Sequence, residues 1–221
     1  MFYFIILALF AYLVGSINPA YILGKKLKGI DLRTVGSGNP GVSNTFRTLG
    51  KGPATAVGCF DVAKGLLPVL AGRLLGLEAY QYILVGLAAV IGHSWPIFYG
   101  FSGGRGMTTS FGAIFVIAPL PLIIFLVTLG ISLYLFKSAG LTMLITFLFM
   151  PLWAFLIGEE RTVILGILSF LGLAIFRRIL GSRYKSHLMV ARGEKLHQPL
   201  WQTMAYRILF DRDTRHADAL R

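Results

Sequence analysis

The chain has 221 residues, of which 56% are hydrophobic and only 14% are charged, and its mean hydropathy is +0.73. A soluble domain carries about 25% charged residues, so this composition excludes an ordinary soluble globular protein and indicates a polytopic membrane protein. The net charge of +12 is spread between the apolar runs and the C-terminal tail. This pattern fits anionic lipid headgroups and leaves no compact basic domain for nucleic acid.

Seven apolar segments follow one another along the chain. A membrane-spanning helix needs about 20 mostly apolar residues, and most of these segments approach that length. The sequence therefore predicts an all-α, polytopic membrane helix bundle with seven transmembrane helices. The expected segments are about 3–24, 53–76, 79–99, 105–118, 119–136, 139–157 and 161–177.

The boundary between the fourth and fifth segments depends on two prolines. The apolar stretch from Met107 to Phe136 is too long for one upright helix. The sequence Ala118-Pro119-Leu120-Pro121 provides a break, because proline lacks an N–H donor and disfavours helix just before it. We therefore expect a short fourth segment and a turn, with one long kinked helix as the alternative.

The basic residues predict the orientation, because they accumulate in short cytoplasmic loops. With the N-terminus outside, the outside turns hold only Arg73 and Arg161. The bias predicts N-out/C-in with seven spans, since merging the fourth and fifth segments would move later basic loops outside. The inside segments are then 25–52, 100–106, the turn at Lys137 and the tail, with Lys25, Lys26, Lys28, Arg33, Arg47, Lys51, Arg105, Lys137 and ten basic residues from Arg177 onward.

The domain organisation is simple. We expect one transmembrane domain over residues 1–180, with cytoplasmic loops at 25–52 and 100–106, and a basic cytoplasmic tail over residues 181–221. The tail contains one mildly amphipathic stretch, Pro199 to Phe210, which is expected either to lie on the membrane surface or to belong to a partly ordered tail.

The first cytoplasmic loop is rich in hydrogen-bond donors. It contains Gly36-Ser37-Gly38-Asn39, followed by Asn44 and Arg47. Glycines let backbone N–H groups turn toward an anion, and the planar guanidinium of Arg47 matches phosphate oxygens. The alternative is an ordinary cytoplasmic turn, but the length and donor density of this loop favour an anion site.

The second cytoplasmic loop opens an apolar helix. It reads Phe101-Ser102-Gly103-Gly104-Arg105-Gly106, followed by Met107 and three hydroxyl residues that include Thr109. A glycine-rich turn before a helix N-terminus offers free N–H groups and the positive end of the helix dipole to an anion. A flexible hinge is the alternative, and the arginine among the glycines favours phosphate binding.

Three ionisable residues lie inside apolar segments. Asp61 and Lys64 are three residues apart, so they share a helix face, and His93 stands just before Trp95-Pro96. Charges in a membrane helix are costly and are either functional or paired with each other. Both readings of Asp61 and Lys64 remain open, as do a site role and a structural hydrogen-bonded role for His93.

Several kinds of chemistry are absent from the sequence. The single cysteine, Cys59, and the four histidines form no metal-ligand grouping, so we expect no metal and no cofactor. Ser37 lacks the G-x-S-x-G context of a hydrolase nucleophile, since position 35 is valine. No histidine is followed five residues later by aspartate, so the H-x-x-x-x-D signature of many CoA- or carrier-dependent glycerolipid acyltransferases is missing.

Taken together, the loop motifs resemble the bacterial acyl-phosphate:glycerol-3-phosphate acyltransferase family. The resemblance covers about residues 10 to 115 in one order and spacing. It rests on Gly15-Ser16-Ile17-Asn18-Pro19, Asp31-Leu32-Arg33, Gly36-Ser37-Gly38-Asn39 through Arg47, Asp61-Val62-Ala63-Lys64-Gly65, Gly92-His93-x-x-Pro96 and Phe101-x-Gly103-Gly104-Arg105-Gly106.

The resemblance implies a seven-span enzyme whose site faces the cytoplasm. Such an enzyme moves a fatty acyl group from acyl-phosphate to the 1-hydroxyl of glycerol 3-phosphate and makes lysophosphatidic acid without CoA or metal. It implies Ser37 and Arg47 as key residues and a phosphate-binding glycine loop with its cation at Arg105, where the family normally has lysine. The expected substrate-binding residues are Gly38, Asn39, Asn44, Lys64, His93, Gly103, Gly104, Arg105, Gly106 and Thr109.

The family's third motif, roughly H-x-x-N followed by G-E, is altered in the tail. If His187 is the motif histidine, Val190 occupies the asparagine position. If Gly193-Glu194 sets the register, Arg183 and Ser186 stand in place of the histidine and asparagine. His187 is included as a catalytic candidate, although a phosphate oxygen of the substrate is the preferred base.

These observations predict a monomeric, multi-pass protein of the bacterial inner membrane that belongs to phospholipid biosynthesis. Its expected partners are acyl-phosphate, glycerol 3-phosphate and the anionic bilayer, without nucleic acid. Two alternatives remain open: a non-catalytic phospholipid- or phosphate-binding or transport paralogue that kept the phosphate loops, and an acyltransferase for another acceptor alcohol.

Overall fold

A computed structural model describes residues 1–136 and 139–191 of the chain, with some side chains of residues 133–144 and those from 181 onward left out. Within these residues the protein is entirely helical, which confirms the all-α prediction. The helices are α1 (Phe2–Gly15), α2 (Pro19–Lys28), α3 (Val42–Leu49), α4 (Lys51–Leu74), α5 (Ala79–Ser94), the 3₁₀ turn η1 (Ile97–Tyr99), α6 (Met107–Ile117), α7 (Pro119–Phe136), α8 (Ala139–Leu156) and α9 (Arg161–Ala191).

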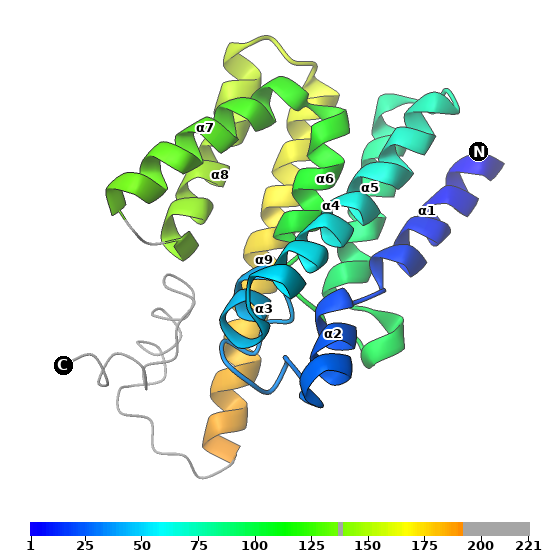
Figure 1. Cartoon of the computed structure of the whole chain (residues 1–221). Helices are drawn as coiled ribbons and strands as arrows, with labels where there is room; N and C mark the ends of the chain where they lie inside the picture. The colour runs from blue at the N-terminus through cyan, green and yellow to red at the C-terminus, as the bar shows by residue number, and fades with distance from the viewer. Residues whose placement is uncertain (137–138, 192–221) are drawn as a thin grey trace.

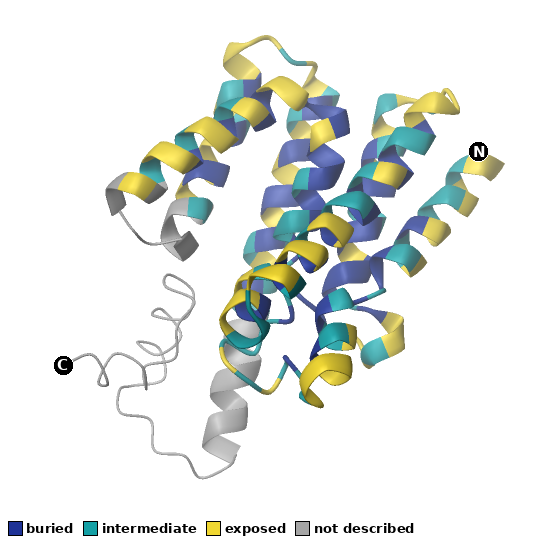
Figure 2. Ribbon diagram, in the orientation of Figure 1, coloured by how far each residue is buried: buried dark blue, intermediate teal, exposed yellow. Residues whose placement is uncertain are grey.

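Four segments are long and apolar enough to cross a membrane: Phe2–Lys28, Lys51–Leu74, Ala79–Tyr99 and Arg161–Leu180. Three shorter apolar helices accompany them, Met107–Ile117, Pro119–Ser132 and Ile145–Leu156. Large apolar side chains such as Leu126, Phe155 and Leu165 cover the outward faces, while the buried residues gather where the helices face one another (Figure 2). This arrangement belongs to a membrane protein, because lipid takes the place of water around the apolar exterior.

The first apolar segment is not one helix over 3–24, as the sequence suggested. Helix α1 ends at Gly15 and α2 begins at Pro19, with Asn18 between them accepting a hydrogen bond from the Tyr21 N–H at 3.0 Å. Asparagine before a helix and proline at its first position are strong start signals, so they restart the chain in a new helix. Hydropathy alone does not reveal such a break.

Of two further predicted helix boundaries, the structure confirms one and contradicts the other. The break at Ala118-Pro119 is confirmed, because α6 ends at Ile117 and α7 starts at Pro119. The last helix, expected over 161–177, instead continues to Ala191 and crosses the boundary expected at residue 180. Hydropathy indicates only the part of a helix that lipid can cover. The basic sequence beyond Arg177 can remain helical in water, so the helix is longer than its apolar part.

The helices α1, α4, α5, α6 and α9 lie side by side as a bundle, and α7 and α8 form a pair beside it (Figure 1). The side chains of Phe125, Phe147 and Phe170 have no exposed surface and pack α7, α8 and α9 together. The connections after α4, α6 and α8 lie at one end of the bundle. At the other end lie α2, α3, η1, the turn before α6 and the continuation of α9 (Figure 1).

Two helix pairs touch backbone to backbone through glycine. An added Cβ on any of these glycines would collide with a carbonyl group of the partner helix, so only glycine permits the spacing. These contacts fix α6 against α4 and α1 against α5, and we call them the glycine seams. They are Gly65 with Thr109, Gly112 with Val62, Gly15 with Ala89, and Gly92 with Tyr12.

Candidate active site

Two polar connections meet at the end of the bundle that carries α2 and α3. We call residues 29–41, between α2 and α3, the first loop, and residues 100–106, before α6, the glycine turn. Leu32 in the first loop is fully buried and packs with Ala20 and Val57, which anchors the loop to α2 and α4. The connections contain the glycine-rich residues that the sequence predicted to bind phosphate, whereas Asn44 and Arg47 lie on α3, which follows the first loop.

The shape of the first loop is set by Asn44, which lies on α3 and is 1% exposed. Its Nδ2 donates to the carbonyl oxygens of Leu32 at 2.9 Å and Val35 at 3.0 Å, and its Oδ1 accepts from the Ser37 N–H at 3.1 Å. All of these partners belong to the loop itself. Asn44 was expected to offer donors to a substrate, but in this structure both of its amide hydrogens hold the protein backbone.

Ser37 lies at the centre of the loop and is half-buried. Its Oγ accepts a long hydrogen bond from the Asn39 N–H at 3.4 Å, and Gly38 adopts a left-handed backbone with a φ of 63°. The turn therefore places Ser37, Gly38 and Asn39 together. Arg47, in the last turn of α3, is exposed and has no hydrogen-bond or ion-pair partner among the described residues, so its guanidinium is available to an anion.

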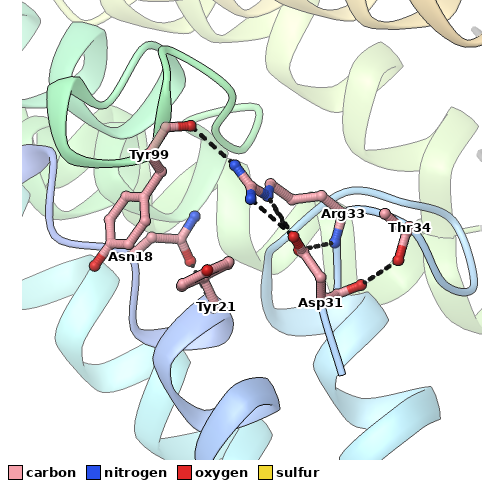
Figure 3. Close-up of polar contacts among 6 residues, drawn as sticks. All are labelled: Asn18, Tyr21, Asp31, Arg33, Thr34 and Tyr99. Carbon is pink, nitrogen blue, oxygen red and sulfur yellow. Dashed lines mark hydrogen bonds and ion pairs between the residues drawn. The ribbon is translucent and has the colours of Figure 1, made fainter. Parts of the chain in front are cut away.

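Arg33 links the first loop to η1, the segment just before the glycine turn (Figure 3). Its guanidinium donates to both carboxylate oxygens of Asp31, at 2.8 Å and 3.0 Å, and to the Tyr99 carbonyl at 2.9 Å. It also lies 4.8 Å from the ring centroid of Tyr21, whose ring is 4.8 Å from that of Tyr99. The hydrogen bonds from Arg33 hold the pKa of Asp31 below its ordinary value, so the carboxylate stays charged and the link stays intact at neutral pH.

The glycine turn rests on His93 at the end of α5. The Gly104 N–H donates to the His93 carbonyl at 3.1 Å, and the Gly104 backbone lies so close to the imidazole that an added Cβ would collide with Nε2. Gly106 adopts a left-handed backbone with a φ of 76° and caps α6, and its carbonyl accepts from the Ser110 N–H at 2.8 Å. The turn therefore leads directly into the N-terminus of α6.

A buried ionic cluster lies beneath this turn. Lys64 Nζ is 2.7 Å from Asp61 Oδ1 and donates to the Ile17 carbonyl at 2.9 Å, at the break between α1 and α2. His93 Nδ1 approaches the same Asp61 oxygen at 3.4 Å, a close polar contact without hydrogen-bond geometry. All three side chains are at most 5% exposed. The pairing of Asp61 with Lys64 that the sequence left open is therefore present within α4, and the cluster connects α4 to His93 on α5 and to the break between α1 and α2.

Arg177 supports the glycine turn from the opposite side. It projects from α9 and donates from Nη2 to the Gly103 carbonyl at 2.9 Å and from Nε to the Gly104 carbonyl at 3.1 Å. Its guanidinium carbon lies 5.5 Å from the Trp95 ring centroid. From the sequence Arg177 serves only as a topology marker, because the contact joins residues more than seventy positions apart.

The structure thus brings the predicted residues into two groups joined by Arg33. One group contains Ser37, Gly38, Asn39 and Asn44, and the other contains Lys64, His93 and the glycine turn. Thr109 is fully buried beside the second group, with no hydrogen-bond partner for its Oγ1 among the residues that the structure describes, and Arg105 is half-buried in the turn itself. His187 lies on α9 ten residues beyond Arg177, and its side chain is outside the described residues.

Metal binding has no support in the part of the chain that the structure describes, where no three His, Cys, Asp or Glu side chains gather as ligands.

Similarity to known proteins identifies the family. A family model described as glycerol-3-phosphate acyltransferase matches residues 5–185, which include both loops, the ionic cluster and Arg177. The chain belongs to the glycerol-3-phosphate acyltransferase family. The match ends before His187, so the altered third motif lies at and beyond its edge.

Relatives of this acyltransferase family resemble most of the chain. Glycerol-3-phosphate acyltransferase 5 of Dehalococcoides mccartyi is 37% identical over 218 residues, which cover 96% of this chain and 90% of the relative. The acyltransferase of Escherichia fergusonii is 55% identical over 107 residues, 48% of this chain and 52% of the relative. The higher identity over the shorter stretch shows that similarity is concentrated in part of the chain.

Two crystal structures share the fold of this acyltransferase. Both are of PlsY (YgiH), an integral membrane glycerol 3-phosphate acyltransferase. The glycerol 3-phosphate form has a TM-score of 0.74 at 30% identity and covers 90% of this chain and 97% of its own. The lysophosphatidic acid form has a TM-score of 0.70 at 29% identity, with 90% and 96% covered. The helical arrangement around the loops is therefore that of a membrane acyltransferase.

Proposed function

We propose that this protein transfers a fatty acyl group from acyl-phosphate to the 1-hydroxyl of glycerol 3-phosphate and so forms lysophosphatidic acid. The observation that carries the proposal is the pair of donor-rich loops at one end of the bundle, joined by Arg33, in a chain of the glycerol-3-phosphate acyltransferase family. Both proposed substrates carry a phosphate group, and two adjoining anion sites suit this reaction.

Each loop has its own task in this proposal. The glycine turn, with Arg105 and the N-terminus of α6, holds one phosphate, because N–H groups and a cation converge there. Arg47, whose guanidinium is unpaired among the described residues, holds the other. Ser37 orients the acyl carbonyl or the acceptor hydroxyl, while Asn44 keeps the first loop in shape and Lys64 and His93 support the turn from below.

The reaction needs neither a covalent enzyme intermediate nor a cofactor. Acyl-phosphate is a mixed anhydride, so its carbonyl carbon is already activated. The 1-hydroxyl oxygen of glycerol 3-phosphate bonds to that carbon, the carbon–oxygen bond to phosphate breaks, and inorganic phosphate leaves with its electron pair. A phosphate oxygen of the substrate accepts the hydroxyl proton. Holding both reactants in register can lower the barrier by about 7–11 kcal/mol, and the cations stabilise the developing negative charge.

An apolar groove of about 750 Å³ between α3 and α4 suits the acyl chain. Phe46 and Val42 on α3 and Leu66 and Leu67 on α4 line it, together with Lys51 at the first position of α4. Because Val42 lines the groove and directly follows the first loop, a fatty chain in this groove would lie next to that loop.

The membrane arrangement that we propose has seven spans, with the N-terminus outside and the C-terminus inside, in the bacterial inner membrane. It is supported by the gathering of Lys28, Arg33, Arg47 and Arg105 at the loop end of the bundle. We also propose a monomer with a basic tail on the anionic inner surface. In a Cys59→Ala background, Glu78→Cys should react with an impermeant maleimide on intact cells and Lys28→Cys only after permeabilisation; the reverse result would refute this orientation.

The proposed reaction is tested with purified protein in lipid vesicles. Palmitoyl-phosphate, palmitoyl-CoA and palmitoyl carrier protein are each offered with glycerol 3-phosphate, and lysophosphatidic acid is measured. We expect product from palmitoyl-phosphate alone, and its loss in Ser37→Ala and Arg47→Ala by about 100-fold, the scale of a lost catalytic contact.

Matched controls lie on α9, away from the loops. Ser169→Ala removes an exposed hydroxyl that donates to the Leu165 carbonyl, and Arg161→Ala removes an exposed arginine at the first position of the helix. Both should retain activity. A folded wild-type protein that binds palmitoyl-phosphate but forms no product with any acceptor would reject catalysis in favour of a phosphate-binding paralogue. If the protein forms product with a different alcohol and none with glycerol 3-phosphate, it is an acyltransferase for that other acceptor.

A further inference from the structure

Arg177 on α9 holds the glycine turn by hydrogen bonds, and it belongs to none of the loop motifs. Its guanidinium holds two successive carbonyl oxygens, those of Gly103 at 2.9 Å and Gly104 at 3.1 Å. It pairs with no carboxylate among the described residues, and the Trp95 ring covers it at 5.5 Å. A planar fork of donors suits such a double contact, whereas an ammonium group does not.

The two contacts determine where the N–H groups of the turn point. In a planar trans peptide the N–H lies opposite the preceding carbonyl. With the Gly103 carbonyl held by Arg177, the Gly104 N–H points away and meets the His93 carbonyl at 3.1 Å. With the Gly104 carbonyl held in the same way, the Arg105 N–H is directed to the side of the turn opposite Arg177.

Arg177 also makes this corner of the protein more positive. Arg105 is near enough for its charge to act on Arg177, and the positive end of α6 begins two residues later. Two like charges beside a helix N-terminus repel one another, and a phosphate dianion would relieve that repulsion. The buried Thr109 Oγ1, which has no hydrogen-bond partner in the described part of the chain, lies in the first turn of the same helix.

We propose that Arg177 is the positioning residue of the glycine turn. It fixes the two carbonyls so that the Arg105 N–H and the N-terminus of α6 are presented to a substrate phosphate, either that of glycerol 3-phosphate or that of the acyl donor, while the Gly104 N–H stays bound to the His93 carbonyl. The identity of the substrate phosphate rests on the proposed function. The double contact of Arg177 with the Gly103 and Gly104 carbonyls, which we call the clamp, does not depend on it.

The test compares Arg177→Met and Arg177→Lys with Arg73→Met. Arg73 is a matched control, because its guanidinium also donates to a backbone carbonyl, that of Val116 at 3.2 Å, but at the far end of the bundle. We expect Arg177→Met to raise KM for the phosphate substrate held by the turn about 10- to 100-fold, with a smaller change in kcat. Arg177→Lys keeps the charge but not the fork, so it should recover only part of the loss. Separate KM values for glycerol 3-phosphate and palmitoyl-phosphate show which phosphate the turn holds.

Amide hydrogen exchange provides a readout that does not need activity. Exchange at Gly104 and Arg105 should be faster in Arg177→Met, unchanged in Arg73→Met and unchanged in the first loop of both. Orthophosphate should slow exchange in the glycine turn of the wild-type protein and have less effect in both Arg177 variants. If the wild-type protein makes no lysophosphatidic acid, the proposed function fails, while these exchange data still decide whether the clamp exists.

Two results would overturn the proposal. The first is that Arg177→Lys and Arg177→Met both keep the KM values of the wild-type protein and its rate of amide exchange in the glycine turn. The other is a fall in kcat at constant KM with faster exchange throughout the helices, since that pattern describes a general loss of packing. If Arg177→Met does not fold, Arg177→Lys decides between the same outcomes.

Discussion

The first loop and the glycine turn hold similar donors but are supported in different ways. The first loop is stabilised from nearby in the sequence, because Asn44 bonds to Leu32, Val35 and Ser37 within twelve residues. The glycine turn is supported by distant helices, through His93 on α5 and Arg177 on α9. The first loop carries its own support, whereas the shape of the turn depends on the assembled bundle.

This difference implies that substitutions act over different distances. A change near Asn44 should disturb only the first loop, while a change in the membrane helices should reach the glycine turn. Three substitutions test this difference. Local hydrogen exchange in each connection is a readout for the first two, and the pH dependence of unfolding is the readout for the third.

The largest effect is expected from the ionic cluster under the glycine turn. Lys64→Met would leave Asp61 buried without its main partner, and breaking a buried ion pair in this way costs about 3–5 kcal/mol of the free energy of unfolding. Thermal unfolding in detergent should show a clearly lower midpoint. Exchange should rise in the glycine turn, which rests on His93, before it rises around Asn44.

The double variant Asp61→Leu/Lys64→Met is the control for this prediction. Removing both charges leaves no uncompensated ion, so much of the lost stability should return. A double variant as unstable as Lys64→Met would mean that side-chain packing, and not the unpaired charge, causes the loss.

A smaller and more local effect is expected at Asn44. Asn44→Leu removes the donors to the Leu32 and Val35 carbonyls, which should cost about 1–3 kcal/mol because buried acceptors lose their partners. Amide exchange should rise at Ser37 and Gly38 and stay unchanged at Gly104. Equal increases in both connections would show that the first loop is not independent.

The smallest effect is expected at the link between the two connections. Because Arg33 lowers the pKa of Asp31 below 3.8, this pair stabilises the folded protein above that pH, and the contribution is lost as the pH falls through the lowered pKa. Asp31→Asn should therefore be less stable than wild type at neutral pH, by less than about 1 kcal/mol for a partly exposed pair.

The difference between Asp31→Asn and wild type should disappear in acid, which unfolding measured across pH would reveal. Thr34→Ala is a suitable comparison, because it removes a hydrogen bond to the Asp31 carbonyl without changing a titrating group. A difference that is independent of pH would exclude the ion pair as its cause.

The sequence predicted the helical class and the break at Pro119, and it offered the pairing of Asp61 with Lys64 as one of two readings, since each depends on composition or on residues close together in the chain. Apolar length alone did not distinguish one helix from two at Asn18-Pro19. It also underestimated α9, because a helix can continue beyond the bilayer without apolar residues.

The candidate site was predictable as a set of residues but not as a set of contacts. Ser37, Arg47 and the glycine turn carry visible motifs. The role of Asn44 inside the loop, the Arg33 bond to Tyr99 and the Arg177 bonds to Gly103 depend on where helices meet in space. Only an arginine at the C-terminal end of the last apolar segment signalled Arg177, and that signal also fits a simple topology marker.

The glycine seams bear on how a fatty substrate reaches these loops. Where α4 meets α6 and α1 meets α5 through bare backbone, no room remains for a hydrocarbon chain to pass between the helices. A lipid chain therefore cannot enter between α4 and α6 or between α1 and α5 at these contacts. The groove between α3 and α4 is open to it. Under the proposed reaction, we expect the acyl donor to enter and the lipid product to leave through this same groove. Slow diffusion of the product out of the groove would then delay binding of the next donor and limit turnover.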